Sequence, residues 1–286
     1  MRIKVNLLIL IASLGGWLFA TSITEGDSSQ ILKGGWYHWD PYQYTEADID
    51  GNERLIGLDV GLSREITKTA GFKLNYTEVG WKQHVADIKD GKRDIAAGAT
   101  KTTQREEFAY FSEPYREEEN SLFIASGSSI PVQYNSVQEF LDYVKAKEIR
   151  LGITDGFMYA DPIINTFIAD PANASLVQLA PDEGANIIKL TEGQIDGFLA
   201  DRISATTFMW RLGKSTAIKE VRLNISTPIH FMLSKKSVTL DTVEKINEAI
   251  KKVKELGQYG AIYSEQLFTV LLMQTISKPW FLVNDF

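Results

Sequence analysis

The sequence predicts an α/β protein made of two lobes with similar plans. Apolar runs typical of buried strands alternate with amphipathic runs of helical spacing, which is the pattern of a mostly parallel sheet covered by helices. This pattern occurs twice, and an apolar stretch that can link two lobes follows each occurrence. The chain has 286 residues, of which 44% are hydrophobic and 23% are charged. This length and composition fit a globular protein of two domains and argue against a disordered or coiled-coil chain.

The first occurrence runs strand, helix, strand, helix, strand. Leu58, Leu62 and Ile66 recur at helical spacing. Gly71 follows them, and a glycine can adopt the left-handed conformation that ends a helix. The expected strands are residues 30–36, 72–79 and a run from 95, the expected helices are 57–70 and 81–89, and an aromatic loop covers 36–42.

The second occurrence has the same order and shares a local feature with the first. In each, a helix ends at a glycine, and an aspartate three residues later precedes an apolar strand. These pairs are Gly91 with Asp94 and Gly193 with Asp196. We expect both aspartates to cap these turns. The match indicates two lobes with similar plans; the alternative is that such a turn is common to α/β proteins in general. The expected strands are 149–153, 175–179 and 197–201, and the expected helices are 162–169 and 183–190.

Two apolar segments, Ser121–Ser129 and Thr227–Ser234, are the expected crossings between the lobes. A strong helix follows at 241–256, where Asp241 suits the N-cap and Glu244 stands at capping-box spacing. Two crossings place the first and last segments in one lobe. The predicted division is a signal peptide at 1–22, lobe 1 at 23–124, lobe 2 at 125–228, a return to lobe 1 at 229–263 and a C-terminal extension at 264–286.

The N-terminus has the layout of a secretory signal peptide. Arg2 and Lys4 precede an apolar run, and small residues follow at 20–22. An uncleaved anchor is the alternative, but the run is short for the roughly 20 residues that span a bilayer. We therefore expect cleavage that leaves a mature start within residues 21–23. Because the chain also lacks cysteine, we expect a bacterial periplasmic protein and no disulfide, thiolate metal site or cysteine nucleophile.

Charge and motifs exclude further classes of function. The formal net charge is −7 and no basic block occurs, which argues against nucleic-acid binding. His38, His84 and His230 show no metal-ligand spacing, and we interpret them as structural. No glycine-rich phosphate loop or nucleophile elbow is present. The sequence therefore predicts no cofactor and no metal site.

One stretch, Asp94–Tyr115, carries a specific resemblance. It contains an aspartate, a buried strand, a Gly-x-Thr turn, Thr-x-x-Arg and Phe-Ser-x-Pro-Tyr in register. Supporting pieces are Asp40-Pro41-Tyr42, the GLDV at 57–60 and the GQYGAIY at 257–263. From about Ile31 to Tyr263 the chain resembles the bacterial extracellular solute-binding proteins of polar amino-acid uptake systems. The matching residues of the long stretch are Asp94, Gly98, Thr100, Thr102, Arg105, Phe111, Ser112, Pro114 and Tyr115.

The resemblance implies a two-lobed periplasmic binding protein fold with two crossing strands at the hinge, closing on a small amino acid or related carboxylate. It implies a monomer that delivers this ligand to a membrane transporter. Arg105 matches the family's carboxylate-binding arginine, and Asp201 matches its ammonium-binding aspartate. Arg suits a carboxylate because its planar fork donates two hydrogen bonds. The other predicted ligand-binding residues are Gly98, Thr100, Trp36, Trp39 and Tyr42.

Each assignment has a rival interpretation. Arg105 can instead be a surface residue that pairs with Glu106 or Glu107, and Asp201 can cap the next segment or pair with Arg202. The three aromatic residues can instead belong to the core.

The sequence departs from the family pattern in two places. Many members have Gly followed by Ser or Thr after the first strand of lobe 2, but this chain has Gly156-Phe157-Met158. Either backbone groups replace those hydroxyls or the ligand is larger and more apolar there. The tail 264–286 extends past the usual end of the family; it either packs onto lobe 1 or resembles the junction to a fused membrane protein.

Two other functions remain open at this point. The same site serves a ligand sensor that is coupled to a membrane receptor subunit, and the sequence does not separate sensing from transport. Relatives resembling cyclohexadienyl dehydratases suggest an enzyme, which needs a general acid near Arg105. Glu25, Glu46 and Glu53 are available for that role, but nothing marks one of them as poised. We therefore predict a binding protein without catalytic residues.

Overall fold

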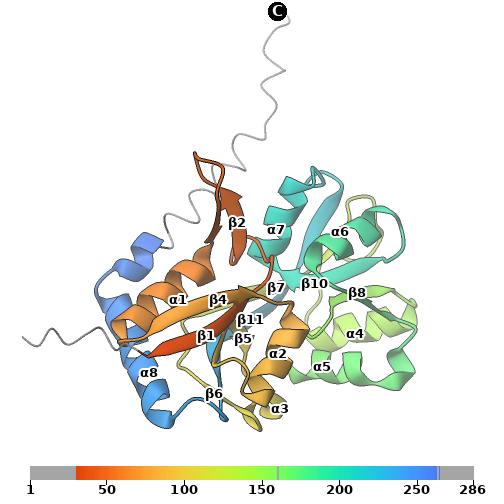
Figure 1. The fold of residues 1–286 in the computed structure, drawn as a ribbon. Helices are drawn as coiled ribbons and strands as arrows, with labels where there is room; N and C mark the ends of the chain where they lie inside the picture. Colours follow the sequence, from red (N-terminus) through yellow and green to blue (C-terminus); the bar gives the residue numbers. More distant parts are fainter. Residues whose placement is uncertain (1–29, 160, 263, 265–286) are drawn as a thin grey trace, which may run out of the picture.

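The protein is described by a computed structural model that covers residues 30–159, 161–262 and 264 (Figure 1). The predicted signal peptide lies outside these residues, as does the predicted extension apart from residue 264. None of the helices in the described ranges is long and apolar enough to cross a membrane.

A nine-stranded mixed sheet runs through the molecule in the order β4-β1-β5-β11-β7-β10-β8-β9, and β6 also pairs with β11. The pairs β1–β4, β1–β5, β8–β9 and β8–β10 are parallel, whereas every pair that includes β7 or β11 is antiparallel. The strands are β1 Ile31–Trp36, β4 Lys73–Glu78, β5 Ile95–Thr100, β6 Ala109–Phe111, β7 Arg116–Ala125, β8 Leu151–Thr154, β9 Val177–Ala180, β10 Gly197–Asp201 and β11 Ile218–Ser234; β2 Tyr44–Ala47 and β3 Glu53–Ile56 form a separate hairpin.

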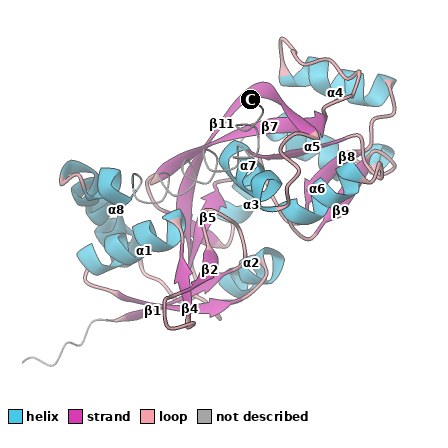
Figure 2. Cartoon of the chain, turned by 90° about the horizontal axis from the view of Figure 1, so that it is seen from above, coloured by secondary structure: helices cyan, strands magenta, loops and turns pink. Residues whose placement is uncertain are grey.

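The helices form two groups (Figures 1 and 2). Helices α1, α2 and α8 lie with β1, β4 and β5, whereas α4 to α7 lie with β8, β9 and β10. Strands β7 and β11 run from one group to the other, as Figure 2 shows. The helices are α1 Leu58–Thr69, α2 Trp81–Asp90, α3 Thr103–Glu106, α4 Val137–Ala146, α5 Pro162–Ala169, α6 Glu183–Thr191, α7 Arg202–Arg211 and α8 Leu240–Glu255.

The two linking strands are longer than the sequence indicated. Strand β11 has 17 residues, pairs with β7 over its first two thirds and with β5 at its end. Its register against β7 shifts between Arg222 and Ile225, and Asn224 within this bulge has a positive φ of 54°. The predicted lobe borders after residues 124 and 228 fall within these two strands and stay a prediction.

The two aspartates that the lobes share have equivalent contacts. Asp94 accepts a hydrogen bond from the backbone N–H of Lys33, and Asp196 accepts one from that of Arg150, both at 2.8 Å. In return, the N–H of each aspartate donates to the carbonyl of the same partner at 2.9 Å. Each aspartate therefore ties the start of its strand to the neighbouring strand, and neither lies in the cavity described below.

The start of α8 differs from the expectation. The N-cap is Thr239, whose hydroxyl accepts a hydrogen bond from the N–H of Thr242 at 3.3 Å. The prediction that Asp241 caps this helix is therefore wrong. Asp241 lies in the first turn, where a negative charge favours the helix dipole, and it pairs with Lys245 at 2.8 Å.

Candidate functional site

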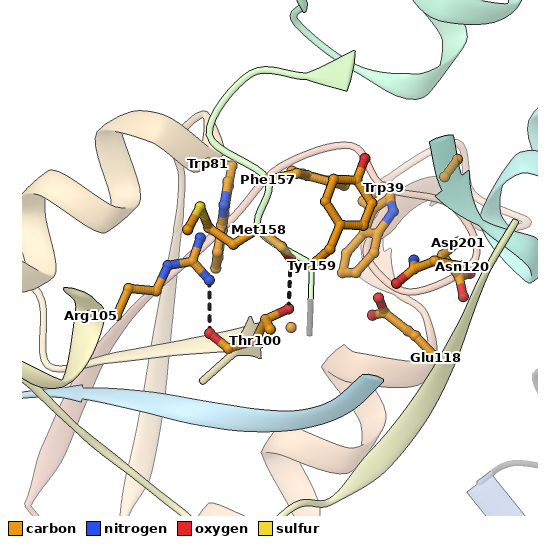
Figure 3. A pocket seen from close by; sticks show the side chains of 12 residues that line it. Trp39, Trp81, Thr100, Arg105, Glu118, Asn120, Phe157, Met158, Tyr159 and Asp201 are labelled. Carbon is orange, nitrogen blue, oxygen red and sulfur yellow. Dashed lines mark hydrogen bonds between the residues drawn. The ribbon is translucent and has the colours of Figure 1, made fainter. Parts of the chain in front are cut away.

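A cavity lies between the two groups of elements, beside the linking strand β7 (Figure 3). Its volume is about 20 Å³, which is room for roughly one water molecule. It is lined by Trp39, Trp81, Gly98, Thr100 and Arg105 from the first group, by Glu118 and Asn120 of β7, and by Phe157, Met158, Tyr159, Ala200 and Asp201 from the second.

Arg105 stands at one end of this cavity. The Thr102 hydroxyl caps the short helix α3 and accepts a hydrogen bond from the N–H of Arg105, which fixes where its side chain starts. The buried guanidinium donates to the carbonyl of Thr100 at 2.9 Å and to that of Gly156 at 3.0 Å. Among the described residues no carboxylate pairs with it, and Glu106, one of its two predicted rival partners, pairs with Lys101 instead. Desolvation lowers the pKa of Arg105 to about 10, so this end of the cavity favours an anion.

Asp201 stands at the opposite end. Its Oδ1 accepts hydrogen bonds from the Tyr42 hydroxyl at 2.8 Å and from the N–H of Ser204 at 2.9 Å, which caps α7. Its buried Oδ2 has no hydrogen-bond partner within the described part of the chain. The rival capping role is therefore real but uses only one oxygen. Arg202, the other rival partner, pairs with Glu119 and Glu220.

A buried ion network lies behind this end. The Arg116 guanidinium meets both oxygens of Asp59 at 2.6 and 3.0 Å and Glu118 Oε1 at 2.7 Å. It also lies 3.8 Å from the centre of the Tyr42 ring. Burial raises the pKa of Glu118 to about 8, against the opposing charge of Arg116. Burial likewise raises the pKa of Asp201. Carboxyl groups thus outnumber cationic ones here, and this end favours a cation.

Aromatic rings form the walls between the two ends. Trp39 meets Phe157 edge to face at 5.8 Å and stacks on Tyr37 at 5.9 Å. Gly98 permits this arrangement: its φ is +76°, and a Cβ there would lie 2.7 Å from the Trp39 ring. The Gly98 N–H already donates to the Tyr115 hydroxyl at 2.8 Å, so this donor is occupied.

The segment 155–158 of the second group closes the cavity. The Gly156 carbonyl accepts from Trp81 Nε1 at 3.1 Å, and the Met158 carbonyl accepts from the Thr100 hydroxyl at 3.0 Å. Lys82 pairs with Asp155 at 2.9 Å. Here the segment that lacks the family's hydroxyl residues supplies carbonyl acceptors. A free amino acid is many times larger than one water, so its binding requires this segment to move away from Trp81 and Arg105.

The structure brings five of the seven predicted residues to the cavity: Trp39, Gly98, Thr100, Arg105 and Asp201. Tyr42 lies behind it and contacts Asp201, and Trp36 is not part of its lining. The ligand contacts of all seven stay predictions. Glu46 and Glu53, considered as general acids, are exposed in the β2–β3 hairpin, and Glu25 lies outside the described residues. The residues that were not predicted are Trp81, Glu118, Asn120, Phe157, Met158, Tyr159 and Ala200.

The structure buries Arg116, Glu118 and Asn120 of β7 and exposes the residues between them. The sequence did not show which glutamate faces inward, because residues 117–119 are all glutamates and the apolar residues 122–124 have both parities. Nothing marked the Phe157 segment either, because its place depends on how the lobes meet. In the described part of the chain no cluster of histidine and acidic residues is suited to a metal ion.

Comparisons with known proteins agree with the resemblance. The sequence profile of the bacterial extracellular solute-binding proteins, family 3, matches residues 34–267. A probable histidine-binding protein of Neisseria gonorrhoeae is 24% identical over 220 residues, which is 76% of each chain. The L-cystine-binding protein TcyA of Bacillus subtilis is 22% identical over 245 residues, which is 85% of this chain and 78% of TcyA.

A solved structure confirms the fold. The arginine-, lysine-, histidine-binding protein ArtJ of Geobacillus stearothermophilus superposes with a TM-score of 0.67 and 21% identity, covering 83% of this chain and 95% of ArtJ. The predicted α/β fold of two lobes is therefore confirmed.

Proposed function

Because the chain belongs to the bacterial extracellular solute-binding proteins of family 3, we propose that it captures a free α-amino acid, or a closely related carboxylate, between its lobes. It then delivers this ligand to an ABC-type membrane transporter. The relatives whose names record binding of histidine, cystine, arginine or lysine support an amino acid as the ligand class.

The charge arrangement of the cavity carries this proposal. Among the described residues, the partners of the buried Arg105 are two backbone carbonyls and the Trp81 ring, and no carboxylate pairs with it; the Asp201 oxygen without a hydrogen-bond partner is buried at the other end. An α-amino acid brings a carboxylate to Arg105 and an ammonium to Asp201. A buried charge is costly unless it is paired, so a zwitterion supplies what both ends need.

Capture follows from the way the lobes meet. The hydrogen bonds of Gly156 and Met158 to Trp81, Arg105 and Thr100 hold the cavity shut. Opening at β7 and β11 separates these partners and admits the ligand, and closure then encloses it. This hinge motion is common among two-lobed binding proteins. The protein acts as a periplasmic monomer after removal of its signal peptide, and it needs no cofactor.

Two other uses of the same site compete with transport. A sensor reads closure through a membrane partner and uses the same contacts, so the genes that neighbour this one distinguish sensing from transport. An enzyme needs a group that reacts with the ligand, whereas the relatives named above are recorded as binding proteins. We therefore assign binding without catalysis.

A thermal-shift screen of the mature protein tests this function. The twenty common L-amino acids and their deaminated acids are each added at 1 mM. A ligand present at about 100 times its Kd stabilises the folded state by about 2.7 kcal/mol. For a chain of this size we expect a rise in Tm of roughly 5–10 °C. Failure of every amino acid to raise Tm would overturn the proposed function.

A further inference from the structure

The Asp201 end of the cavity contains two acidic side chains, which enter from neighbouring strands. Asp201 of β10 stands opposite Asn120 of β7 in an antiparallel register, and Glu118 is the next residue of β7 on the same face. Diagonal neighbours of this kind lie about 7–8 Å apart at Cα, so long side chains can meet between them. Both carboxyl groups line the cavity, and Figure 3 shows the two residues on the side of the cavity opposite Arg105.

The surroundings of this pair leave negative charge uncompensated. Arg116 of β7 faces Glu118, but it is also held by both oxygens of Asp59 from α1. Glu183 of α6 adds a third buried carboxyl group behind Asp201, where it accepts from the Ser204 hydroxyl.

The remaining neighbours add no positive charge. The phenols of Tyr42, Tyr37 and Tyr159 also face this region, and burial raises the pKa of each, so they stay neutral. One shared guanidinium therefore stands against several carboxyl groups, and the ligand's ammonium supplies a positive charge that this end lacks.

We propose that Glu118 is a ligand-binding residue in addition to Asp201: in the closed, empty cavity this pair of carboxyl groups holds one proton, and the ammonium of the ligand displaces that proton to solvent and binds between them. The ammonium keeps its own three protons, so one proton leaves the protein for each ligand bound. This inference rests on the proposed function, because it names a partner for the ammonium of an amino acid.

The geometry predicts a proton that the ligand can displace. Two carboxylates that share a site disfavour each other's ionised form, and burial already raises the pKa of Glu118 and of Asp201. At pH 7 the pair therefore holds a proton. An ammonium between them favours the ionised form of both. Since the proton must leave, affinity rises with pH until the pair ionises on its own near pH 8.

Glu183 provides a matched control within the same acidic cluster. It is buried like Glu118, and its pKa is also raised by burial. Its partner is the Ser204 hydroxyl, however, and it does not line the cavity. A ligand in the cavity has no contact with Glu183, so its proton stays in place.

Calorimetry tests this proposal with the L-amino acid that raises Tm most in the screen. The binding enthalpy at pH 7 is measured in phosphate and in Tris. The difference between the two values is proportional to the number of protons released, because the two buffers take up protons with different enthalpies. We expect release of close to one proton in the wild type and a roughly tenfold gain in affinity between pH 6 and pH 7. Glu118→Gln should release almost none and change less than about threefold over that range, whereas Glu183→Gln should behave as the wild type.

Three outcomes separate the claims. Binding by the wild type without proton release overturns the role of Glu118 and leaves the proposed function intact. If proton release persists in Glu118→Gln but disappears in Glu183→Gln, the proton comes from Glu183, and the role of Glu118 is again overturned. If no amino acid binds, the proposed function fails and this inference fails with it. The wild-type measurement alone decides the first point, so the proposal does not depend on the variants folding.

Discussion

Arg105 and Arg116 are two buried arginines of one cleft with opposite surroundings. Their exposed fractions are 5% and 3%, so burial does not distinguish them. Arg116 meets the carboxylates of Asp59 and Glu118, and these charges raise its pKa despite desolvation. Arg105 meets the carbonyls of Thr100 and Gly156 and the Trp81 ring but no carboxylate of the described residues, and desolvation lowers its pKa to about 10.

The difference indicates that Arg116 is the arginine that stabilises the fold. The charge of Arg116 is neutralised within the fold, so its removal leaves carboxylates unpaired in the interior. The charge of Arg105 is desolvated but not neutralised, so a bound carboxylate would neutralise it in an ion pair. Arginines at similar depth therefore face different charges, and the proposed function assigns the binding role to Arg105.

The largest expected effect is on stability, at Arg116. Breaking a buried ion pair by removing one partner costs about 3–5 kcal/mol, so Arg116→Ala should lower the free energy of unfolding by that amount in urea denaturation. Arg105→Ala is the matched control and should cost less than Arg116→Ala, because it removes two hydrogen bonds to backbone carbonyls and a ring contact but leaves no buried carboxylate unpaired. Equal losses in the two variants would contradict the division of roles.

The next effect is on binding, at Arg105. Removal of a charge-assisted, bidentate contact leaves the ligand carboxylate unpaired, at a cost of about 3–5 kcal/mol. Calorimetry should therefore show Arg105→Ala binding the selected amino acid more than about a hundredfold more weakly. Arg105→Lys should recover only part of this, because an ammonium lacks the planar fork. Binding by Arg105→Ala within about fivefold of wild type would remove Arg105 from this role.

A smaller effect is expected on the pH dependence of Tm, at Glu118, which pairs with Arg116. Burial raises the pKa of Glu118 from 4.5 to about 8. A group whose pKa is raised on folding stabilises the protein below its unfolded pKa, and this contribution is lost as pH rises through the folded value. Without ligand, the Tm of Glu118→Gln minus that of wild type should therefore increase steadily from pH 5 to pH 8. A difference that stays constant with pH would contradict the shift.

The local sequence predicted several elements in which one periodic face is buried, but helix α4 was missed although Phe140, Leu141 and Val144 form such a face. The stripe Leu58, Leu62 and Ile66 of α1 is fully buried, and the predicted bounds 162–169 of α5 agree with the structure. Helix α7 was missed because RISATTFMWR has no single apolar face. The hairpin β2–β3 was missed because each of its strands has only four residues.

The site was predictable only in part for a related reason. Arg105 and Asp201 belong to motifs with a recognisable register, so the resemblance located them. The run REEEN at 116–120 looks like a solvated surface, and Arg116 and Glu118 become buried only because β7 passes between the two lobes. The closing contacts of Gly156 and Met158 depend on the same lobe arrangement, which no local pattern encodes.

The central claim is that the two ends of the cleft recognise the two charges of one ligand. The direct measurement is calorimetric titration of wild type and Asp201→Asn with the selected amino acid and with its deaminated acid. Asp201→Asn should weaken binding of the amino acid by tenfold or more, about 1.4 kcal/mol, and leave that of the deaminated acid nearly unchanged, because Arg105 still holds the carboxylate. Equal losses for both ligands would show that Asp201 does not bind the ammonium, and the account of the site would be wrong.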